Sequence, residues 1–288
     1  ILLKPQVWMA AYSQIFFTLS LGFGIMIAYA SYLPRDSDIS VNATITGIVN
    51  CGFSFLAGLA VFSTLGYMAY TTGKPFHEVV ESGIGLAFVA YPEAIAKMPV
   101  LPSVIGLAFF LLLILAGLSS SISILEAFAS SVMDKYAIRR RRTITLLCIL
   151  GFLGSVIFTT RSGIVWLDIV DHFLTRYGLV VVGLLECIVI GWIYGSHRLR
   201  EHVNRTSNFS VSRGWEFCVR ILTPIILCVI LVSSIYNDLL KSYGGYSRTS
   251  VLVIGFGWLA ATVAVALIFK RSLWRDVEIG NEKAIDVD

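Results

Sequence analysis

The chain has 288 residues, of which 57% are hydrophobic and only 14% are charged. Soluble domains typically carry about 25% charged residues, so this composition excludes an ordinary soluble core and indicates a membrane protein. The formal net charge of +4 says nothing about nucleic acid, and no nucleic-acid partner is expected.

Stretches long enough to cross a lipid bilayer recur along the chain, since one span needs roughly 20 apolar residues. The uncharged or nearly uncharged stretches predict seven spans, at about residues 7–33, 41–71, 103–131, 143–160, 166–196, 217–237 and 249–270. Residues 72–102 are too polar to span and too apolar for a free linker, so we expect a helical hairpin over an external vestibule. Residues 197–216 predict a polar cytoplasmic loop.

The positively charged residues orient these spans in the cell membrane. If the N-terminus is external and the spans alternate, most of the 22 Lys and Arg residues fall on the cytoplasmic side, as the positive-inside rule favours. The strongest anchor is Arg139–Arg142, interpreted as a solvated cytoplasmic loop, with anionic lipid binding as the alternative. No linker composition divides the chain, so residues 1–288 are expected to form one transmembrane domain, with 271–288 as a cytoplasmic tail.

The first predicted span contains a cluster of polar and small residues. Gln14 and Thr18 are four residues apart and share a helix face, and Ser20, Gly22 and Gly24 follow them. Such a cluster weakens a helix, and broken helices expose backbone groups to ions and substrates in many transporters. Close helix packing through small residues explains the same composition, so both interpretations stay open.

Further oxygen-rich clusters lie in the second and third predicted spans. Asn50 and Ser54 share one helix face, and Ala116 precedes the run Ser119–Ser121. Hydroxyl, amide and carbonyl oxygens are hard ligands that suit an alkali cation, although serines in membrane helices often bond only to the carbonyl four residues earlier. The four histidines are dispersed near loops, so no transition-metal site is predicted.

Carboxylates mark the fifth predicted span. Asp168 and Asp171 lie about one helical turn apart near its external end, where they either gate a vestibule or cap the helix N-terminus. Glu126 and Glu186 lie deeper, and each is expected to have a polar partner, because an ionisable group within a membrane is costly. No nucleophile elbow, phosphate-binding glycine loop or zinc-spaced motif is present, so the sequence poorly supports an enzyme.

Several motifs together resemble one family of transporters. The segments Val7–Ala11 and Gln14–Gly24 resemble the sixth transmembrane helix of the neurotransmitter:sodium symporters, and the bacterial leucine-transporter-like members have the nearest pattern. The resemblance continues, in the same order, through Asn50–Gly58, Tyr91–Ala94, Ala116–Ser120 and Gly191–Gly195. It implies the all-α leucine-transporter fold, which has twelve spans. This chain would be spans six to twelve, with seven transmembrane helices and an extracellular helical hairpin, and the first five spans are expected to precede Ile1.

The resemblance also implies ion and substrate ligands. Thr18 and Asn50 would ligate a first sodium ion. Ala116, through its carbonyl oxygen, Ser119 and Ser120 would ligate a second. The substrate pocket would be lined by Phe17, Thr18, Ser20, Phe23, Ser120 and Ile124.

A gate and an anion site are implied in the same way. Phe17 would form part of an outer lid, and Asp171 would be the acidic half of an external gate. Gln14, Thr18 and Ser54 would face a chloride ion. Ser54 stands where chloride-independent bacterial relatives carry a carboxylate, so chloride dependence is the hypothesis; a bond from Ser54 back to the Asn50 carbonyl is its alternative.

The expected function is therefore sodium-coupled symport of a small amino acid or related amine across the cell membrane. The alternatives are a channel or sodium-coupled carrier of another superfamily with the same fold, and a membrane scaffold that does not transport. The identity of the substrate cannot be read from these spans.

Overall fold

The computed structural model describes residues 5–73, 75–76, 85–98, 100–240 and 242–272. Regular structure in these residues is entirely helical, with no strand among them, which confirms the all-α fold class. The chain forms two compact units. The first combines Ile1–Ser40 with Ile124–Asp288, and the second is Val41–Ser123.

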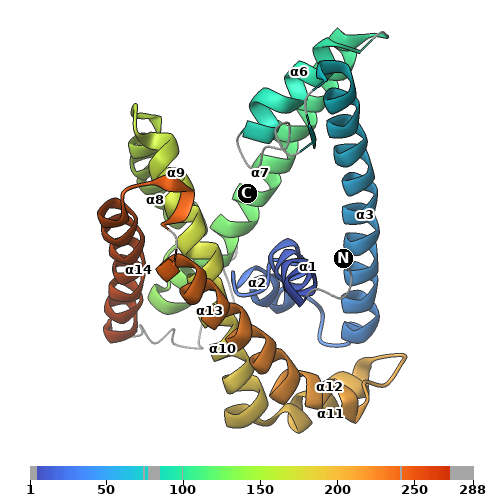
Figure 1. The fold of residues 1–288 in the computed structure, drawn as a ribbon. Coiled ribbons are helices and arrows are strands. Elements are labelled where there is room, and N and C mark those ends of the chain that lie inside the picture. The colour runs from blue at the N-terminus through green and yellow to red at the C-terminus, as the bar shows by residue number, and fades with distance from the viewer. Residues whose placement is uncertain (1–4, 74, 77–84, 99, 241, 273–288) are drawn as a thin grey trace. The chain divides into compact units, whose positions relative to one another are not determined.

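Figure 1 labels the helices of each unit. The second unit holds most of α3 (Ile39–Thr72), α6 (Tyr91–Ala96) and the first part of α7 (Pro102–Tyr136). The first unit holds the end of α7 together with α1 (Pro5–Thr18), α2 (Ile25–Ser31), α8 (Arg140–Ser155), α9 (Gly163–Phe173), α10 (Leu179–Ile188), α11 (Ser196–Thr206), α12 (Arg213–Phe217), α13 (Thr223–Leu240) and α14 (Arg248–Arg271).

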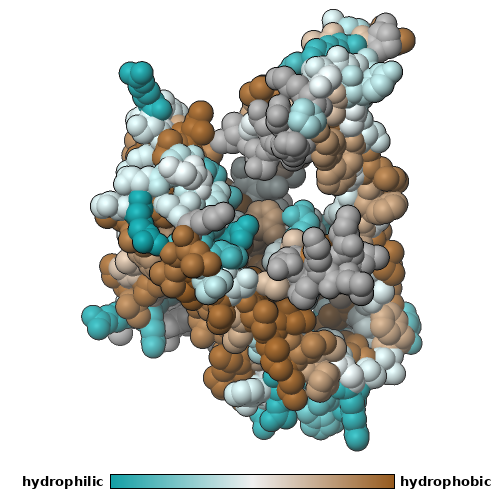
Figure 2. All heavy atoms as spheres, in the orientation of Figure 1, coloured by the Kyte–Doolittle hydropathy of each residue, from teal (hydrophilic) through white to brown (hydrophobic). Residues whose placement is uncertain are grey.

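Six helical runs among the described residues are long and apolar enough to cross a membrane. They are Ile39–Thr72, Pro102–Tyr136, Arg140–Thr159, Gly163–Thr206, Arg213–Gly245 and Arg248–Arg271. Each coincides with one of the last six predicted spans. Hydrophobic side chains cover the middle of α3 and the lower parts of α10 and α13 in the space-filling view, as expected for helices that face lipid (Figure 2).

The first predicted span is a broken helix. α1 ends at Thr18 and α2 begins at Ile25. Between them Ser20, Gly22 and Gly24 have φ angles of 55°, 78° and 74°. These left-handed conformations are compatible with glycine and strained for serine, so the small-residue cluster breaks the helix here.

The first unit has a continuous packed core. Phe16 of α1, Val180 of α10, and Leu227 and Ile230 of α13 form one buried cluster. Gly183 makes this packing possible, because a Cβ at this position would lie 2.7 Å from Phe16 Cζ. A second cluster joins α9 to α14 through Ile169, Phe173, Tyr177 and Val251.

The second unit is held mainly at one end. Leu65 and Met68 of α3 pack against Ala90 and Ala94, and Tyr91 stacks on Phe109 of α7 with ring centroids 5.0 Å apart. Leu86–Ala96 is helical and supplies one arm of the expected hairpin. Residues 77–84, where the other arm was expected, lie outside the described residues.

Two loop predictions were wrong. Residues 197–216 are not a loop throughout, because α11 occupies Ser196–Thr206 and α12 starts at Arg213. Likewise Arg140–Arg142 form the first turn of α8, and only Arg139 precedes it. In both places high polarity was interpreted as loop, although a charged helix end that leaves the membrane is equally polar.

Candidate functional site

The break between α1 and α2 leaves backbone groups without helical partners. The last backbone bonds of α1 are made by the N–H groups of residues 19–21. They donate to the carbonyl oxygens of Ile15, Phe17 and Phe16, in that order. Within the described residues no backbone hydrogen bond ends on the carbonyl oxygens of 19–23. Carbonyls released in this way are the groups with which broken membrane helices coordinate cations.

The two aromatic residues predicted for the substrate pocket meet across this break. Phe17, in the last turn of α1, and Phe23 contact each other edge to face, with ring centroids 5.7 Å apart. The adjacent Phe16 is buried against α10 and α13, which fixes α1 and leaves Phe17 about half exposed. The structure therefore supports Phe17 and Phe23 as neighbours in one aromatic wall.

The serine run of α7 is bonded within its own helix. Ser119 Oγ donates to the Ala116 carbonyl at 2.9 Å, and Ser121 Oγ donates to Gly117 at 2.8 Å. Ser120 and Ile124 are exposed on the same helix. A serine hydroxyl that donates one hydrogen bond keeps its oxygen lone pairs, so Ser119 and Ala116 still present two neighbouring oxygens that fit an alkali cation.

Asn50 and Ser54 lie on α3, in the second unit, and Gln14 and Thr18 lie on α1, in the first. Both Asn50 and Ser54 are partly buried. Among the described residues Ser54 Oγ donates no hydrogen bond, so the alternative bond to the Asn50 carbonyl is absent.

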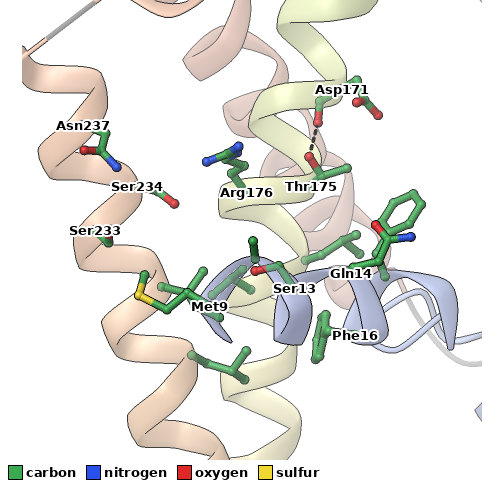
Figure 3. A pocket seen from close by; sticks show the side chains of 16 residues that line it. Met9, Ser13, Gln14, Phe16, Asp171, Thr175, Arg176, Ser233, Ser234 and Asn237 are labelled. Atoms are coloured by element: carbon green, nitrogen blue, oxygen red, sulfur yellow. Dashed lines mark hydrogen bonds between the residues drawn. The ribbon is translucent and has the colours of Figure 1, made fainter. Parts of the chain in front are cut away.

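A pocket of about 500 Å³ lies in the first unit between α1, α13 and the helical run that contains α9 and α10 (Figure 3). Gln14 and Phe17 line it from α1, and Asp171 lines it from α9. Arg176 also lines it, and its side chain extends toward α13 in the close view. Asp171 and Arg176 form no ion pair with any residue that the structure describes.

Asp168 and Asp171 do not cap a helix. α9 begins at Gly163, more than one turn before either carboxylate. Asp168 instead accepts hydrogen bonds from Tyr243 and Tyr246, each at 3.0 Å. Asp171 faces the pocket, so the gating interpretation is the one that its position supports.

Sequence reasoning missed a polar cluster behind Asp171. His172 Nε2 lies 2.7 Å from Asp238 Oδ2, and the Tyr177 hydroxyl donates to the same oxygen at 2.7 Å. A signal was present, because Asp238 directly follows the uncharged stretch predicted as the sixth span. The predicted span stopped at residue 237, so its closing carboxylate was not considered.

The deep carboxylates differ in their surroundings. Glu126 accepts a two-pronged interaction from Arg140, at 2.7 and 2.8 Å, and a hydrogen bond from Tyr32 at 2.6 Å. This joins the end of α2, α7 and α8 at one point. Glu186 has no hydrogen-bond or ion-pair partner in the part of the chain that the structure describes, so the partner expected for it is not found there.

The chain resembles known transporters over almost its full length. A family model described as the sodium:neurotransmitter symporter family matches residues 1–277. An uncharacterised sodium-dependent transporter of Methanocaldococcus jannaschii is 46% identical over 272 residues, 94% of this chain. A sodium-dependent dopamine transporter of Caenorhabditis elegans is 35% identical over 88% of the chain. A mouse sodium- and chloride-dependent neutral and basic amino acid transporter is 38% identical over 81%.

The chain covers only part of these relatives. It spans 55% of the length of the archaeal transporter, 42% of the nematode transporter and 37% of the mouse transporter. Transport by the complete protein is therefore inferred from the family and from the site geometry together.

Proposed function

The chain belongs to the sodium:neurotransmitter symporter family, and from this premise we propose that the complete protein carries out sodium-coupled symport of a small amino acid or related amine across the cell membrane. The observation that carries the proposal is the break between α1 and α2, whose carbonyl oxygens accept no backbone hydrogen bond from the described residues and lie beside Phe17 and Phe23. A scaffold would gain nothing from an interrupted, strained helix in the membrane.

The proposed first sodium ligands are Thr18 and Asn50, and the proposed second set is Ala116, Ser119 and Ser120. All supply neutral oxygens, which suit a singly charged alkali cation better than a transition metal. Sodium would stabilise the outward-facing state and complete the substrate site, and both would leave when the protein changes state. The coupling is then a difference in sodium affinity between two conformations.

The proposed substrate pocket is formed by Phe17, Thr18, Ser20, Phe23, Ser120 and Ile124. Phe17 would close over the substrate and Asp171 would gate the external side. The names of the relatives include dopamine and neutral and basic amino acids, which supports a small amine or amino acid as the class. The mouse relative is named as chloride-dependent. Chloride dependence of this protein would fit the neutral hydrogen-bond donors Gln14, Thr18 and Ser54.

The test is uptake by the complete protein reconstituted in liposomes. Radiolabelled leucine, glycine, lysine and dopamine are offered with an inward sodium gradient, and with potassium in its place. At least one should accumulate above its external concentration with sodium only, and a sodium ionophore should abolish the accumulation. Equal entry of every probe in both salts would exclude the proposal; passive equilibration that needs sodium would favour a channel.

The proposed orientation places the N-terminal end of α1 outside and α8's arginines inside. Arg141 is exposed and has no ion-pair partner among the described residues, so it is a better probe than Arg140. The thiol of an Arg141→Cys variant should not react with a membrane-impermeant reagent applied to intact cells, and it should react after permeabilisation. Labelling in intact cells would reverse the topology.

A further inference from the structure

His172, Tyr177 and Asp238 form what we term the Asp238 cluster. Both His172 and Tyr177 reach Asp238 Oδ2 at 2.7 Å. The His172 side chain is only 3% exposed, and that of Asp238 is 24% exposed. None of the three lines the pocket, so the cluster lies behind the pocket wall rather than within it.

A π-helical turn makes this convergence possible. His172 and Tyr177 are five residues apart, and in an α-helix such residues point about 140° away from each other. The turn Leu174–Gly178 is π-helical, and its wider i to i+5 pattern brings residues five apart toward one side. The Asp238 carboxylate therefore stabilises the π-turn through two hydrogen bonds that a regular helix would not form.

Other residues of the same turn face the pocket. Thr175 and Arg176 lie inside the π-turn, Asp171 precedes it by one turn, and all three line the pocket. Conversion of the π-turn to regular helix would change the register by one residue, a rotation of about 100° for every side chain that follows. The π-turn thus connects the Asp238 cluster to the pocket wall.

A second contact clamps α9 one turn earlier. Asp168 accepts hydrogen bonds from Tyr243 and Tyr246, in the segment between α13 and α14. Burial, and then the bond to Asp168, raise the pKa of Tyr246, so its hydroxyl remains a donor. The Tyr243 ring also stacks on His172, with centroids 3.7 Å apart. α9 is consequently held by other elements at both Asp168 and His172, while Asp171 between them has no ion pair with any described residue.

We propose that Asp238, His172 and Tyr177 are positioning residues for the external gate: they hold the π-turn so that Asp171 and Arg176 face the pocket. The gating role rests on the proposed function, whereas the placement of Asp171 and Arg176 at the pocket does not. Neither charged side chain has an ion-pair partner among the described residues to fix its place, so the backbone that the Asp238 cluster holds decides where each one points.

The test measures the position of the pocket wall without any substrate. Thr175→Cys is introduced into the complete protein with its native cysteines replaced, and its reaction rate with a cationic methanethiosulfonate is followed in detergent, where both faces are accessible. Tyr177→Phe removes the hydroxyl that holds the turn. Tyr236→Phe is the matched control, because Tyr236 is 62% exposed on α13 and makes no hydrogen bond within the described residues.

Tyr177→Phe should change the reaction rate about fivefold, the equivalent of one net hydrogen bond, whereas Tyr236→Phe should leave it unchanged. Asp238→Leu should act at least as strongly. Asp238→Asn keeps an acceptor oxygen, so its reaction rate should lie closer to the native rate than that of Asp238→Leu. Equal rates in the two tyrosine variants would overturn the proposal.

Uptake separates this inference from the proposed function. In a protein that transports leucine, Tyr177→Phe should raise KM while the maximal rate changes little, and Tyr236→Phe should change neither. An altered labelling rate in a protein that transports no probe would leave the positioning role standing and reject the gate. Unaltered labelling together with normal sodium-driven uptake would reject the positioning role alone.

Discussion

The polar groups around α9 and those in the middle of α3 and α7 make different kinds of contact. Around α9, side chains from separate elements bond to each other, and His172, Phe173 and Tyr177 are buried. No residue in the most apolar stretch of α3 or α7 is buried within its own chain. Ser119 bonds only to its own helix, and among the described residues Ser54 donates no hydrogen bond.

This difference separates groups that fix the fold from groups with capacity for a ligand. A polar group whose bonds are all made to other parts of the protein contributes to stability and specificity. A hydroxyl that bonds only within its own exposed helix contributes little to stability. Changes in α3 should therefore alter ion dependence, and changes near the packed end of the first unit should alter stability.

The largest expected effect is that of Asn50→Ala. Loss of one of few oxygen ligands should raise the sodium concentration needed for half-maximal uptake by at least about tenfold, the equivalent of roughly 1.4 kcal/mol. Asn42→Ala is the matched control on α3, because Asn42 is exposed. An unchanged sodium requirement in Asn50→Ala would remove it from the sodium site.

Replacement of chloride by gluconate should lower uptake by the wild-type protein several-fold. A cation near the membrane centre is costly unless a negative charge lies close by. Ser54 supplies a hydrogen-bond donor but no charge, so the negative charge would come from chloride. Ser54→Glu should make uptake independent of chloride, whereas Ser54→Ala should not. Full wild-type uptake in gluconate would reject the chloride site.

Gly22→Ala tests the packed side of the comparison. Gly22 has a φ of +78°, and an added Cβ would lie 3.2 Å from the Leu179 carbonyl oxygen of α10. The left-handed conformation alone costs alanine about 1–2 kcal/mol, so thermal stability should fall. Gly257→Ala, with open space around its Cβ position, should leave it unchanged. Equal melting temperatures for the two variants would contradict the strained break.

The smallest effect is expected at the start of α8. Arg140 holds Glu126 in a two-pronged pair, while the neighbouring Arg141 has no ion-pair partner among the described residues. Arg140 is 59% exposed, so Arg140→Gln should destabilise the protein by no more than about 1 kcal/mol. Arg141→Gln should have no measurable effect. Thermal denaturation of both variants at low and high salt measures the difference.

Apolar length was enough to predict the six long spans, because every span needs a stretch of roughly 20 apolar residues. Neighbouring small residues predicted the break in the first span only as one of two interpretations, since glycine serves packing and distortion equally. The Asp238 cluster could not be predicted, because it depends on a π-turn that changes which residues share a face. Sequence spacing assumes a regular helix, in which His172 and Tyr177 would point apart.

The charged helix ends show the same limit. Arg139–Arg142 and α11 were predicted as loops because polarity was treated as a sign of irregular structure. In the structure Arg140–Arg142 begin α8, and Arg140 reaches Glu126, fourteen residues earlier in the chain. The pairing of Glu126 with Arg140 depends on how the chain turns between α7 and α8, and no local pattern in the sequence encodes that contact.

Substrate-triggered sodium entry tests the central claim, sodium-coupled transport, most directly. The complete protein in liposomes is given radiolabelled sodium, with and without the substrate identified by the uptake panel, and both fluxes are recorded together. The account predicts that substrate starts sodium entry at a fixed ratio of sodium to substrate, and that Asn50→Ala lowers both fluxes together at limiting sodium. Sodium entry that is the same with and without substrate would contradict it.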